Sequence, residues 1–232
     1  MKVIIAAAGT GGHINPGIAI ANKIKEEQPN SEIIFIGTTR GLENDLVPRA
    51  GYKLKTIEAY GLSSKLSINN IRKIIKTFQG LFQAKAIVKK FKPDIVIGTG
   101  GYICGATILA AHNQKIPTVL HESNAFPGKA VKMLYKKTDK ILVGFKDAKE
   151  RLGNTEKTII TGTPTKIKKI NFSNSEKKQK LKEIGLNDEK PIILVFGGSQ
   201  GAQAINNAIL GLIKRNLNKN YQIIWAARTK TI

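Results

Sequence analysis

The sequence has little cysteine, few acidic residues and no long hydrophobic run. Its single cysteine, Cys104, excludes an internal disulfide, and we expect this side chain to be a small buried hydrophobe. No apolar run reaches the roughly 20 residues that a membrane-spanning helix needs. The apolar run at residues 3–8 is also too short for the core of a signal peptide. The sequence therefore predicts neither a disulfide-stabilised secreted domain nor an integral membrane protein.

Acidic residues are scarce relative to basic ones. The chain has 38 lysines and arginines against 16 aspartates and glutamates, which gives a formal net charge of +22 and a pI near 10.1. Such a charge favours anionic partners. Zinc-finger spacings, RNP-like aromatic strands and arginine runs are missing, so we do not expect nucleic acid to be that partner. An anionic membrane surface fits the lysine-rich composition better.

Cofactor motifs are missing too. No glycine loop matches G-x-G-x-x-G, because Ile14 stands where the third glycine would fall, and the Gly128–Lys129 pair lacks the rest of a P-loop. The sequence has no Asp-x-Asp pair and no clustered His and Cys ligands. These absences disfavour a nicotinamide dehydrogenase and a P-loop ATPase. We expect a reaction that needs neither a metal ion nor another cofactor.

What is present is a glycine loop after each of three strand-like runs. The loops are GTGGH (9–13), GTGGY (98–102) and GGSQGA (197–202). A helical pattern follows each loop, so that backbone N–H groups and the positive end of a helix dipole meet there. This arrangement is typical of sites for phosphate or sugar oxygens and predicts a nucleotide or another phosphorylated ligand.

Strand-like runs alternate with helical patterns along the chain. They fall near residues 2–8, 32–37, 53–57, 94–98, 117–120, 139–143, 157–160, 191–196 and 221–226. The alternation predicts an α/β fold with a doubly wound parallel sheet, whose ligands bind at the carboxyl ends of the strands. A polar, lysine-rich segment follows GTPTK (162–166), so we predict a domain boundary near Gly162, with one domain over 1–162 and a second over 163–232.

The stretch between Glu58 and Asp94 has no acidic residue and contains an apolar stripe at helical spacing. The stripe consists of Ile68, Ile71, Ile74, Ile75, Phe78, Leu81 and Phe82, and it is flanked by Arg72, Lys73 and Lys76. These residues predict a basic amphipathic helix. Two interpretations stay open: the stripe packs on a sheet while the lysines face solvent, or it docks on an anionic bilayer.

Two histidines border the predicted ligand loops. His13 ends the first glycine loop at the start of a helix, and His121 opens HESNAFPG (121–128) after the fifth strand. A lone histidine is more often structural than catalytic, but an imidazole beside a ligand loop can act as a general base. His13 is the stronger candidate base, because it directly follows Gly11 and Gly12 at a helix N-terminus.

Five motifs in this order and at these spacings resemble one family. GTGGH, GTGGY, HESNAFPG, GTPTK and GGSQGA together resemble the MurG family of GT-B glycosyltransferases over essentially the whole chain. The resemblance implies two Rossmann-like domains, the first binding the acceptor lipid I and the second binding most of UDP-N-acetylglucosamine. It implies inverting transfer of N-acetylglucosamine to the carbon 4 hydroxyl of the muramyl residue, which gives lipid II for peptidoglycan synthesis.

The resemblance also implies roles for single residues. The matching substrate-binding positions are Thr10, Gly11, Gly12, Asn124, Lys166, Gly198, Ser199 and Gln200. The first loop would contact the donor sugar or the acceptor diphosphate, Asn124 the donor sugar, and the Ser199 loop the UDP diphosphate. Lys166 stands where the family usually has arginine, so that a fork-shaped contact would become a point charge. The stripe with its cations would dock at the cytoplasmic face of the membrane, where the family's acceptor is anchored.

The second domain is shorter than the resemblance implies. The chain stops at Ile232, and no acidic residue follows Glu189, where the family has an acidic donor-binding residue. We therefore expect a truncated second domain. Three functions stay open: the glycosyltransferase, a related transferase that uses a UDP-sugar to build another glycolipid, and a non-catalytic remnant that binds lipid I or the membrane.

Overall fold

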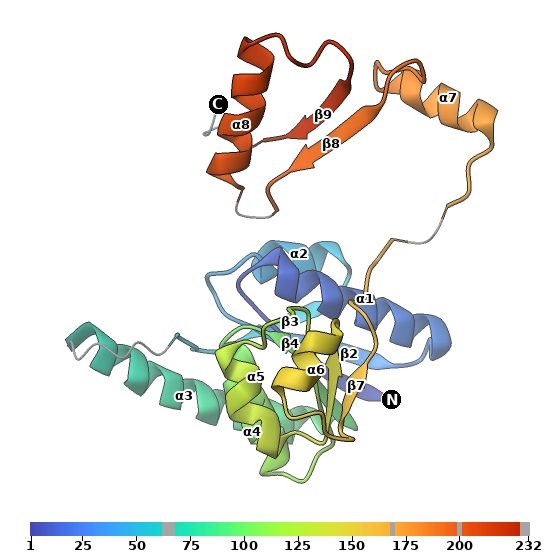
Figure 1. Ribbon diagram of the computed structural model, residues 1–232. Helices are drawn as coiled ribbons and strands as arrows, with labels where there is room; N and C mark the ends of the chain where they lie inside the picture. The colour runs from blue at the N-terminus through green and yellow to red at the C-terminus, as the bar shows by residue number, and fades with distance from the viewer. Residues whose placement is uncertain (62–67, 168–169, 199–200, 228–232) are drawn as a thin grey trace. The chain divides into compact units, whose positions relative to one another are not determined.

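The chain forms two compact units, Met1–Ile167 and Lys168–Ile232. The computed structural model describes residues 1–61, 68–167, 170–198 and 201–227, and it describes residues 68–74 by their backbone alone. Each unit is built from helices and parallel strands (Figure 1). The break between the units follows the GTPTK motif.

One parallel sheet organises the first unit. Its strands are β1 (Lys2–Ala7), β2 (Glu32–Gly37), β3 (Lys53–Thr56), β4 (Ile95–Gly100), β5 (Thr118–Glu122), β6 (Lys140–Val143) and β7 (Thr158–Ile160). The strand order is β3-β2-β1-β4-β5-β6-β7, and every described pair is parallel. This order confirms the predicted doubly wound sheet.

β1 lies inside this sheet, between β2 and β4, and is buried on both faces. Its continuous apolar run is typical of a parallel strand covered on both sides. Val3 and Ile5 join one hydrophobic cluster, and Ile4 and Ala6 join the other. Each fully buried side chain of this size stabilises the fold by about 1.5–3 kcal/mol.

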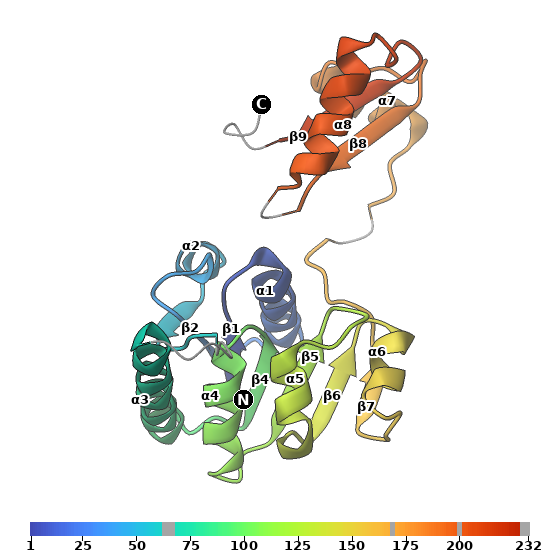
Figure 2. The same cartoon turned by 60° about the vertical axis from the view of Figure 1, so that its left-hand side comes forward.

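Helices cover both faces. They are α1 (Gly11–Glu27), α2 (Glu43–Arg49), α3 (Ile68–Phe91), α4 (Ile103–His112), α5 (Lys129–Leu134), the short 3₁₀ helix η1 (Tyr135–Lys137) and α6 (Lys146–Arg151). α1 and α2 contribute Ile14, Ile18 and Val47 to the cluster around Val3. The other face is covered by α3, α4 and α5, which lie side by side in Figure 2.

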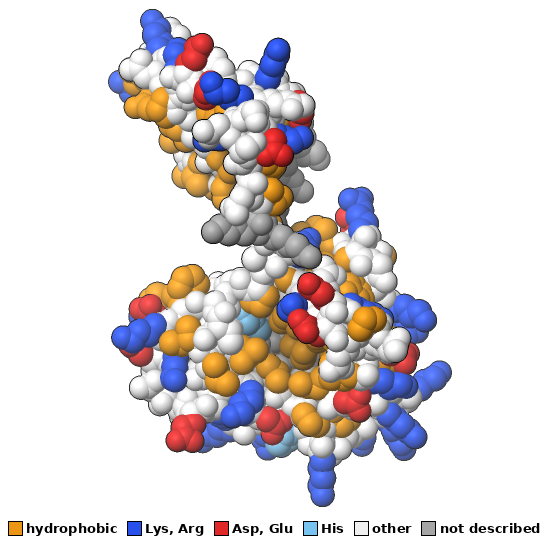
Figure 3. Space-filling model, turned by 90° about the vertical axis from the view of Figure 1, so that its right-hand side faces the viewer, with side chains coloured by type: hydrophobic (Ala, Val, Ile, Leu, Met, Phe, Trp, Pro, Cys, Tyr) orange, Lys and Arg blue, Asp and Glu red, His pale blue; other side chains and the backbone are white. Residues whose placement is uncertain are grey.

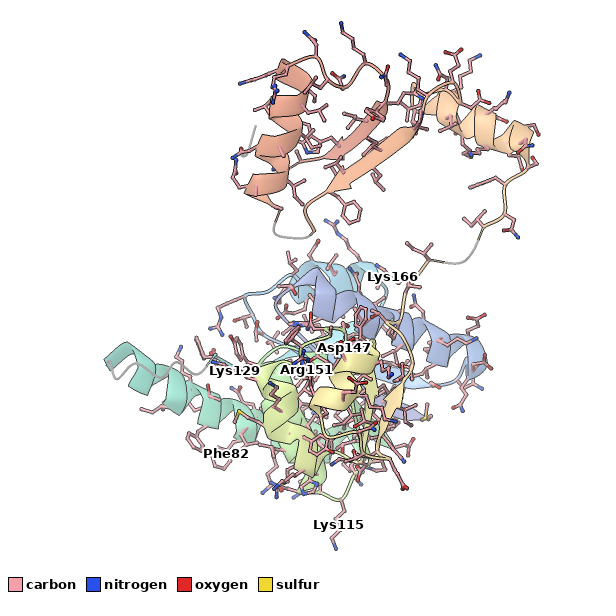
Figure 4. The ribbon with its side chains drawn as sticks, in the orientation of Figure 1. Phe82, Lys115, Lys129, Asp147, Arg151 and Lys166 are labelled. Carbon is pink, nitrogen blue, oxygen red and sulfur yellow. The ribbon has the colours of Figure 1, made fainter. Side chains whose placement is uncertain are left out.

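α3 has one face in the core and one in solvent. Gly80, Ala84 and Val88 are buried, and Leu81 packs against the core cluster. In contrast, Ile75 is 53% exposed, Phe78 60% and Phe82 69%, and Phe82 projects outward from the helix (Figure 4). The predicted stripe is therefore divided, with its Leu81 side packed and its Phe82 side uncovered.

The second unit contains α7 (Asn174–Glu183), β8 (Ile192–Phe196), α8 (Gln203–Lys214) and β9 (Gln222–Ala226). β8 and β9 pair in parallel, with α8 between them in the chain. The Trp225 indole Nε1–H donates to Asn206 Oδ1 at 3.2 Å and ties α8 to β9. A side chain at Gly197 would overlap the backbone of Ala202, so the loop between β8 and α8 needs glycine there.

The surface reflects the basic composition. Lysine and arginine side chains project from much of the surface shown in Figure 3, with hydrophobic side chains exposed between them. Among the residues described here, no helix is both long and apolar enough to cross a membrane.

Candidate functional site

A cavity of about 670 Å³ opens at the carboxyl edge of the first unit's sheet. β1 pairs with β2 on one side and with β4 on the other, so the chain direction of the crossovers reverses between β1 and β4. Ligands of doubly wound sheets bind at such a switch point. The loops after β1, β2, β3, β4 and β5 all line the cavity.

His13 lies in the first turn of α1 and lines this cavity. Its Nδ1 lies 3.1 Å from the carbonyl oxygen of Ala8. Because a carbonyl oxygen can only accept, Nδ1 carries the hydrogen and donates it. In the neutral imidazole this tautomer places the lone pair on Nε2, which is the arrangement that a general base needs.

The His13 ring is positioned by its neighbours from β4. The Thr99 hydroxyl donates to the His13 carbonyl oxygen at 2.8 Å. A Cβ at Gly100 would overlap the imidazole ring, and Gly100 also has a φ of +129°, which disfavours any other residue. The bare backbone of Gly100 therefore makes room for the ring at this edge.

Two helices begin at the cavity without a side-chain cap. α1 and α4 have no acidic residue in their first turns, and the side chains of their N-cap residues, Thr10 and Tyr102, accept no capping hydrogen bond. By contrast, α7 in the second unit has a full capping box between Ser173 and Glu176. Uncapped N–H groups and positive dipole ends suit an anionic group of a ligand.

Glu122 shapes the loop after β5. Its Oε1 accepts from the backbone N–H and the side-chain amide of Asn124 at 2.9 and 2.7 Å, and its Oε2 accepts from Gly128 N at 2.7 Å. The buried carboxylate thus closes the loop on itself. Asn124 is held at the cavity wall by these bonds.

His121 is held by the protein at both ring nitrogens. Its Nε2 donates to the Gly162 carbonyl oxygen at 3.1 Å, and its Nδ1 accepts from the Ser123 hydroxyl at 3.4 Å. Burial lowers the pKa of this imidazole. These contacts make His121 a neutral structural side chain. Of the two cavity histidines, His13 is therefore the better candidate for proton transfer, through its Nε2.

Glu43 is a site residue that the sequence did not reveal. It is fully buried, its Oε1 accepts from Thr38 N and Oγ1 at 2.8 and 2.7 Å, and its Oε2 accepts from Gly9 N at 2.9 Å. The carboxylate therefore joins the loop after β1 to the loop after β2. In the sequence, an acidic residue in the first turn of a helix indicates only a favourable dipole contact.

The predicted site residues do not all come together in the described part of the chain. Thr10, His13 and Asn124 line the cavity, with Gly11 and Gly12 beside them in the first turn of α1. Lys166 is exposed on the segment after β7 (Figure 4) and does not line the cavity.

Gly198 has a φ of +71° in the loop after β8, whereas Ser199 and Gln200 lie outside the described residues. Arg72, Lys73 and Ile74 belong to α3, but their side chains are outside the description too.

The described residues present neither a cluster of metal ligands nor a reactive thiol. No group of three or more His, Cys, Asp and Glu side chains in the described ranges could hold a metal ion. Cys104 is buried as predicted, and burial raises the pKa of its thiol to about 12.

Known proteins resemble this chain in sequence and in fold. The model for the glycosyltransferase family 28 N-terminal domain matches residues 3–143. The UDP-N-acetylglucosamine--N-acetylmuramyl-(pentapeptide) pyrophosphoryl-undecaprenol N-acetylglucosamine transferase of Acetivibrio thermocellus is 45% identical over 216 residues, which cover 93% of this chain and 58% of the relative. The transferase of the same name from Clostridioides difficile is 44% identical, with 97% and 55% covered.

Solved structures give the same result. MurG of Acinetobacter baumannii superimposes with a TM-score of 0.65 at 27% identity, covering 92% of this chain and 57% of that one. A UDP-GlcNAc 2-epimerase from Neisseria meningitidis, bound to UDP-GlcNAc, shares the fold at a TM-score of 0.59 and 18% identity, with 99% and 66% covered. The chain spans less than two thirds of the length of each of these proteins.

The fold and the glycine loops at its carboxyl edge define an α/β protein of the GT-B class. The chain belongs to glycosyltransferase family 28, in the MurG family.

Proposed function

We propose that this chain is the acceptor-binding domain and the start of the donor-binding domain of an inverting glycosyltransferase. The enzyme moves N-acetylglucosamine from UDP-N-acetylglucosamine to the carbon 4 hydroxyl of the muramyl residue of lipid I and so makes lipid II for peptidoglycan synthesis. Residues 1–162 hold lipid I, and residues 163–232 begin the domain for the UDP-sugar. The single observation that carries the proposal is the His13 ring, whose Nδ1 donates to Ala8 and so directs Nε2 to the reaction, in a cavity where α1 and α4 begin.

The proposed chemistry is a single displacement. The acceptor hydroxyl oxygen attacks the anomeric carbon of the donor sugar, while the bond from that carbon to the UDP oxygen breaks. The hydroxyl proton passes to Nε2 of His13. The resulting imidazolium keeps its bond from Nδ1 to the Ala8 carbonyl, whose dipole stabilises the new positive charge.

The diphosphate groups go to backbone amides and helix dipoles. Thr10, Gly11 and Gly12 at the start of α1 take the acceptor diphosphate or the donor sugar, and Asn124 contacts the donor sugar. Gly198, Ser199 and Gln200 cradle the UDP diphosphate before α8, and Lys166 adds a cation. The family membership supports these roles, which need neither a metal ion nor another cofactor.

α3 supplies the membrane contact in this proposal. Ile74, Ile75, Phe78 and Phe82 enter the outer part of an anionic leaflet, while Arg72, Lys73 and Lys76 meet its headgroups. The exposure of Ile75, Phe78 and Phe82 supports this arrangement. It makes the protein peripheral on the cytoplasmic face of the cell membrane, where it reaches a lipid-anchored acceptor without spanning the bilayer.

The test is transfer of labelled N-acetylglucosamine from its UDP donor to a short-chain lipid I analogue by the folded 232-residue chain. Product would establish donor, acceptor and reaction together. A folded chain that binds the lipid I analogue but forms no product would contradict catalysis by this chain and indicate an acceptor-binding remnant. UDP-glucose in place of the donor is the control for sugar specificity.

A further inference from the structure

The chain leaves the sheet of the first unit at the end of β7. This strand ends at Ile160, and the first unit itself ends at Ile167. The backbone N–H of Thr161 still donates to the Val143 carbonyl oxygen at 3.0 Å, beyond the last paired residues of β6 and β7. After Thr161 the ladder stops, so other contacts decide where the connection to the second unit becomes free.

Gly162 is tied to the wall of the cavity. Its carbonyl oxygen accepts from Nε2 of His121, a cavity residue, at 3.1 Å. The same oxygen accepts from the neighbouring Thr161 hydroxyl at 3.2 Å, as the two lone pairs of a carbonyl allow. The Thr161 bond joins adjacent residues only. The His121 bond therefore joins the chain after β7 to a different strand, β5.

His121 is a fixed point of the sheet. It lies opposite Leu142 in the pairing of β5 with β6, and its side chain is buried. The Ser123 hydroxyl donates to Nδ1 at 3.4 Å, which leaves the ring hydrogen on Nε2 for Gly162. A buried ring with a partner at each nitrogen has little freedom to rotate. The Gly162 carbonyl is therefore held where β5 holds the imidazole.

Thr163 lies against the same edge of the sheet. A Cβ added to Gly144, the residue after β6, would come within 2.7 Å of Thr163 Oγ1. The bare backbone of Gly144 thus makes room for this hydroxyl. Gly162 has a φ of +75°, which favours glycine and allows the chain to turn between Thr161 and Thr163.

These ties end at Thr163. In the described ranges 164–167 and 170–172, no residue is hydrogen-bonded to another element, and the Ile167 N–H donates to the nearby Thr165 hydroxyl at 3.1 Å. Lys166 and Ile167 are exposed. Regular structure resumes after Ser173, the N-cap of α7. A segment with so few contacts opens at a low free-energy cost.

We propose that His121 is a positioning residue that ties the connection between the two units to the cavity wall, so that the pivot of this connection lies after Thr163. His121 contacts no reacting atom in this role. The inference rests on the proposed function in one respect, namely that donor and acceptor are held by different units. Turnover then depends on where the free part of the connection begins.

The test compares two amides at position 121 that differ by one methylene. The side-chain nitrogen of glutamine can take the place of Nε2 and donate to Gly162, whereas that of asparagine ends near the place of Nδ1. Tryptic cleavage after Lys166, the first lysine beyond Thr163, is followed by mass spectrometry in the whole chain. Thr161→Val is the matched control, because it removes the other hydrogen bond to the Gly162 oxygen without untying the chain from β5.

Cleavage after Lys89 in α3 serves as the reference, since it reports opening of the first unit as a whole. His121→Asn should raise the ratio of cleavage after Lys166 to cleavage after Lys89 about threefold or more, because cleavage tracks the opened population and one hydrogen bond is lost. His121→Gln and Thr161→Val should keep the ratio within about twofold of the wild type. A general loss of stability would raise cleavage at both lysines and leave the ratio unchanged.

An unchanged ratio in His121→Asn would overturn the proposal. An equal rise in His121→Gln would overturn it as well, because the reach of the donor would then not matter. If His121→Asn does not fold, His121→Leu replaces it, since leucine fills more of the site and has no donor. The cleavage ratio needs neither substrate, so its failure is distinguishable from failure of the transfer assay.

Discussion

At the scale of single residues, His13 has the strongest chemical assignment. In the proposed reaction its Nε2 takes the acceptor proton, because Nδ1 donates to the Ala8 carbonyl oxygen. His13→Ala should lower the turnover number in the transfer assay about 100-fold or more, the usual contribution of a general base. His112→Ala, at the end of α4, is the matched control and should retain its turnover. Near-wild-type turnover of His13→Ala would remove this histidine from the role.

Glu43 affects the site without touching a ligand. In Glu43→Gln the new amide can accept at one end only, so its NH₂ group must face either Thr38 or the backbone N–H of Gly9. The clash of donors should cost about 1–3 kcal/mol of unfolding free energy. It should also lower turnover, because Gly9 leads into the α1 loop.

The control is Glu32→Gln, which removes one charge from an exposed pair with Lys2. Exposed pairs contribute little, so its urea midpoint should stay near that of the wild type. Equal stability of Glu43→Gln and Glu32→Gln would show that the buried carboxylate does not join the two loops.

The sequence indicated His13 and Asn124 because each lies in a recognisable loop motif. It did not indicate Glu43, because the contacts of this carboxylate join loops that follow different strands. Such contacts exist only once β2 and β1 lie side by side in the sheet, and no local spacing encodes them.

At the scale of elements, α3 is the part whose surroundings the sequence left open. Replacing both Phe78 and Phe82 by serine should weaken binding to anionic vesicles about tenfold or more, since each ring would lose its burial among acyl chains. The far-UV spectrum and melting temperature should not change, because neither ring is in the core. Phe172→Ser, at another exposed phenylalanine, is the matched control. Unchanged vesicle binding of the double variant would contradict the membrane role of the stripe.

The packing of α3 depends on Gly80. A Cβ there would overlap the carbonyl oxygen of Glu58, so Gly80→Ala should destabilise the first unit by about 1–3 kcal/mol. Gly105→Ala in α4 is the matched control, because nothing lies within 4 Å of its Cβ position. That variant should be unchanged or more stable by up to about 1 kcal/mol. Equal urea midpoints for the two variants would show that α3 does not approach the loop this closely.

The elements themselves were largely predictable. β1, β2 and β4 coincide with apolar runs that the sequence showed, because a parallel strand buried on both faces is apolar at consecutive positions. The environment of α3 was not predictable in the same way. Leu81 and Phe82 are neighbours in the stripe, and only the position of α4 decides that the first is packed and the second is not.

At the scale of the whole molecule, the pH dependence of stability follows from His121. Its pKa is lowered by burial, so below about pH 6.5 the unfolded chain takes up a proton that the folded chain does not. The free energy of unfolding should therefore be fully present above about pH 6.5 and fall as the pH drops from there through the lower folded pKa. Urea titrations between pH 7.5 and pH 5, at about half-unit steps, measure this.

His121→Gln should flatten that fall, while His112→Gln should leave its shape unchanged. At lower pH a second loss should follow from Asp139, whose pKa is lowered by the Thr118 hydroxyl, which donates to Oδ2 at 2.7 Å. This contribution is present above about pH 3.9 and is lost as the pH falls through the folded pKa. A curve for His121→Gln that parallels the wild type would contradict the assignment to His121.

The loop after β1 has little freedom to move. β1 is hydrogen-bonded to a strand on each side, Gly9 is bonded to Glu43, and His13 is bonded to Ala8 and Thr99. Ligand binding therefore has little chain entropy to remove here, because folding has already ordered the amides. The specificity of this loop must come from the shape that it already has, and a ligand that does not fit cannot be accommodated by closure around it.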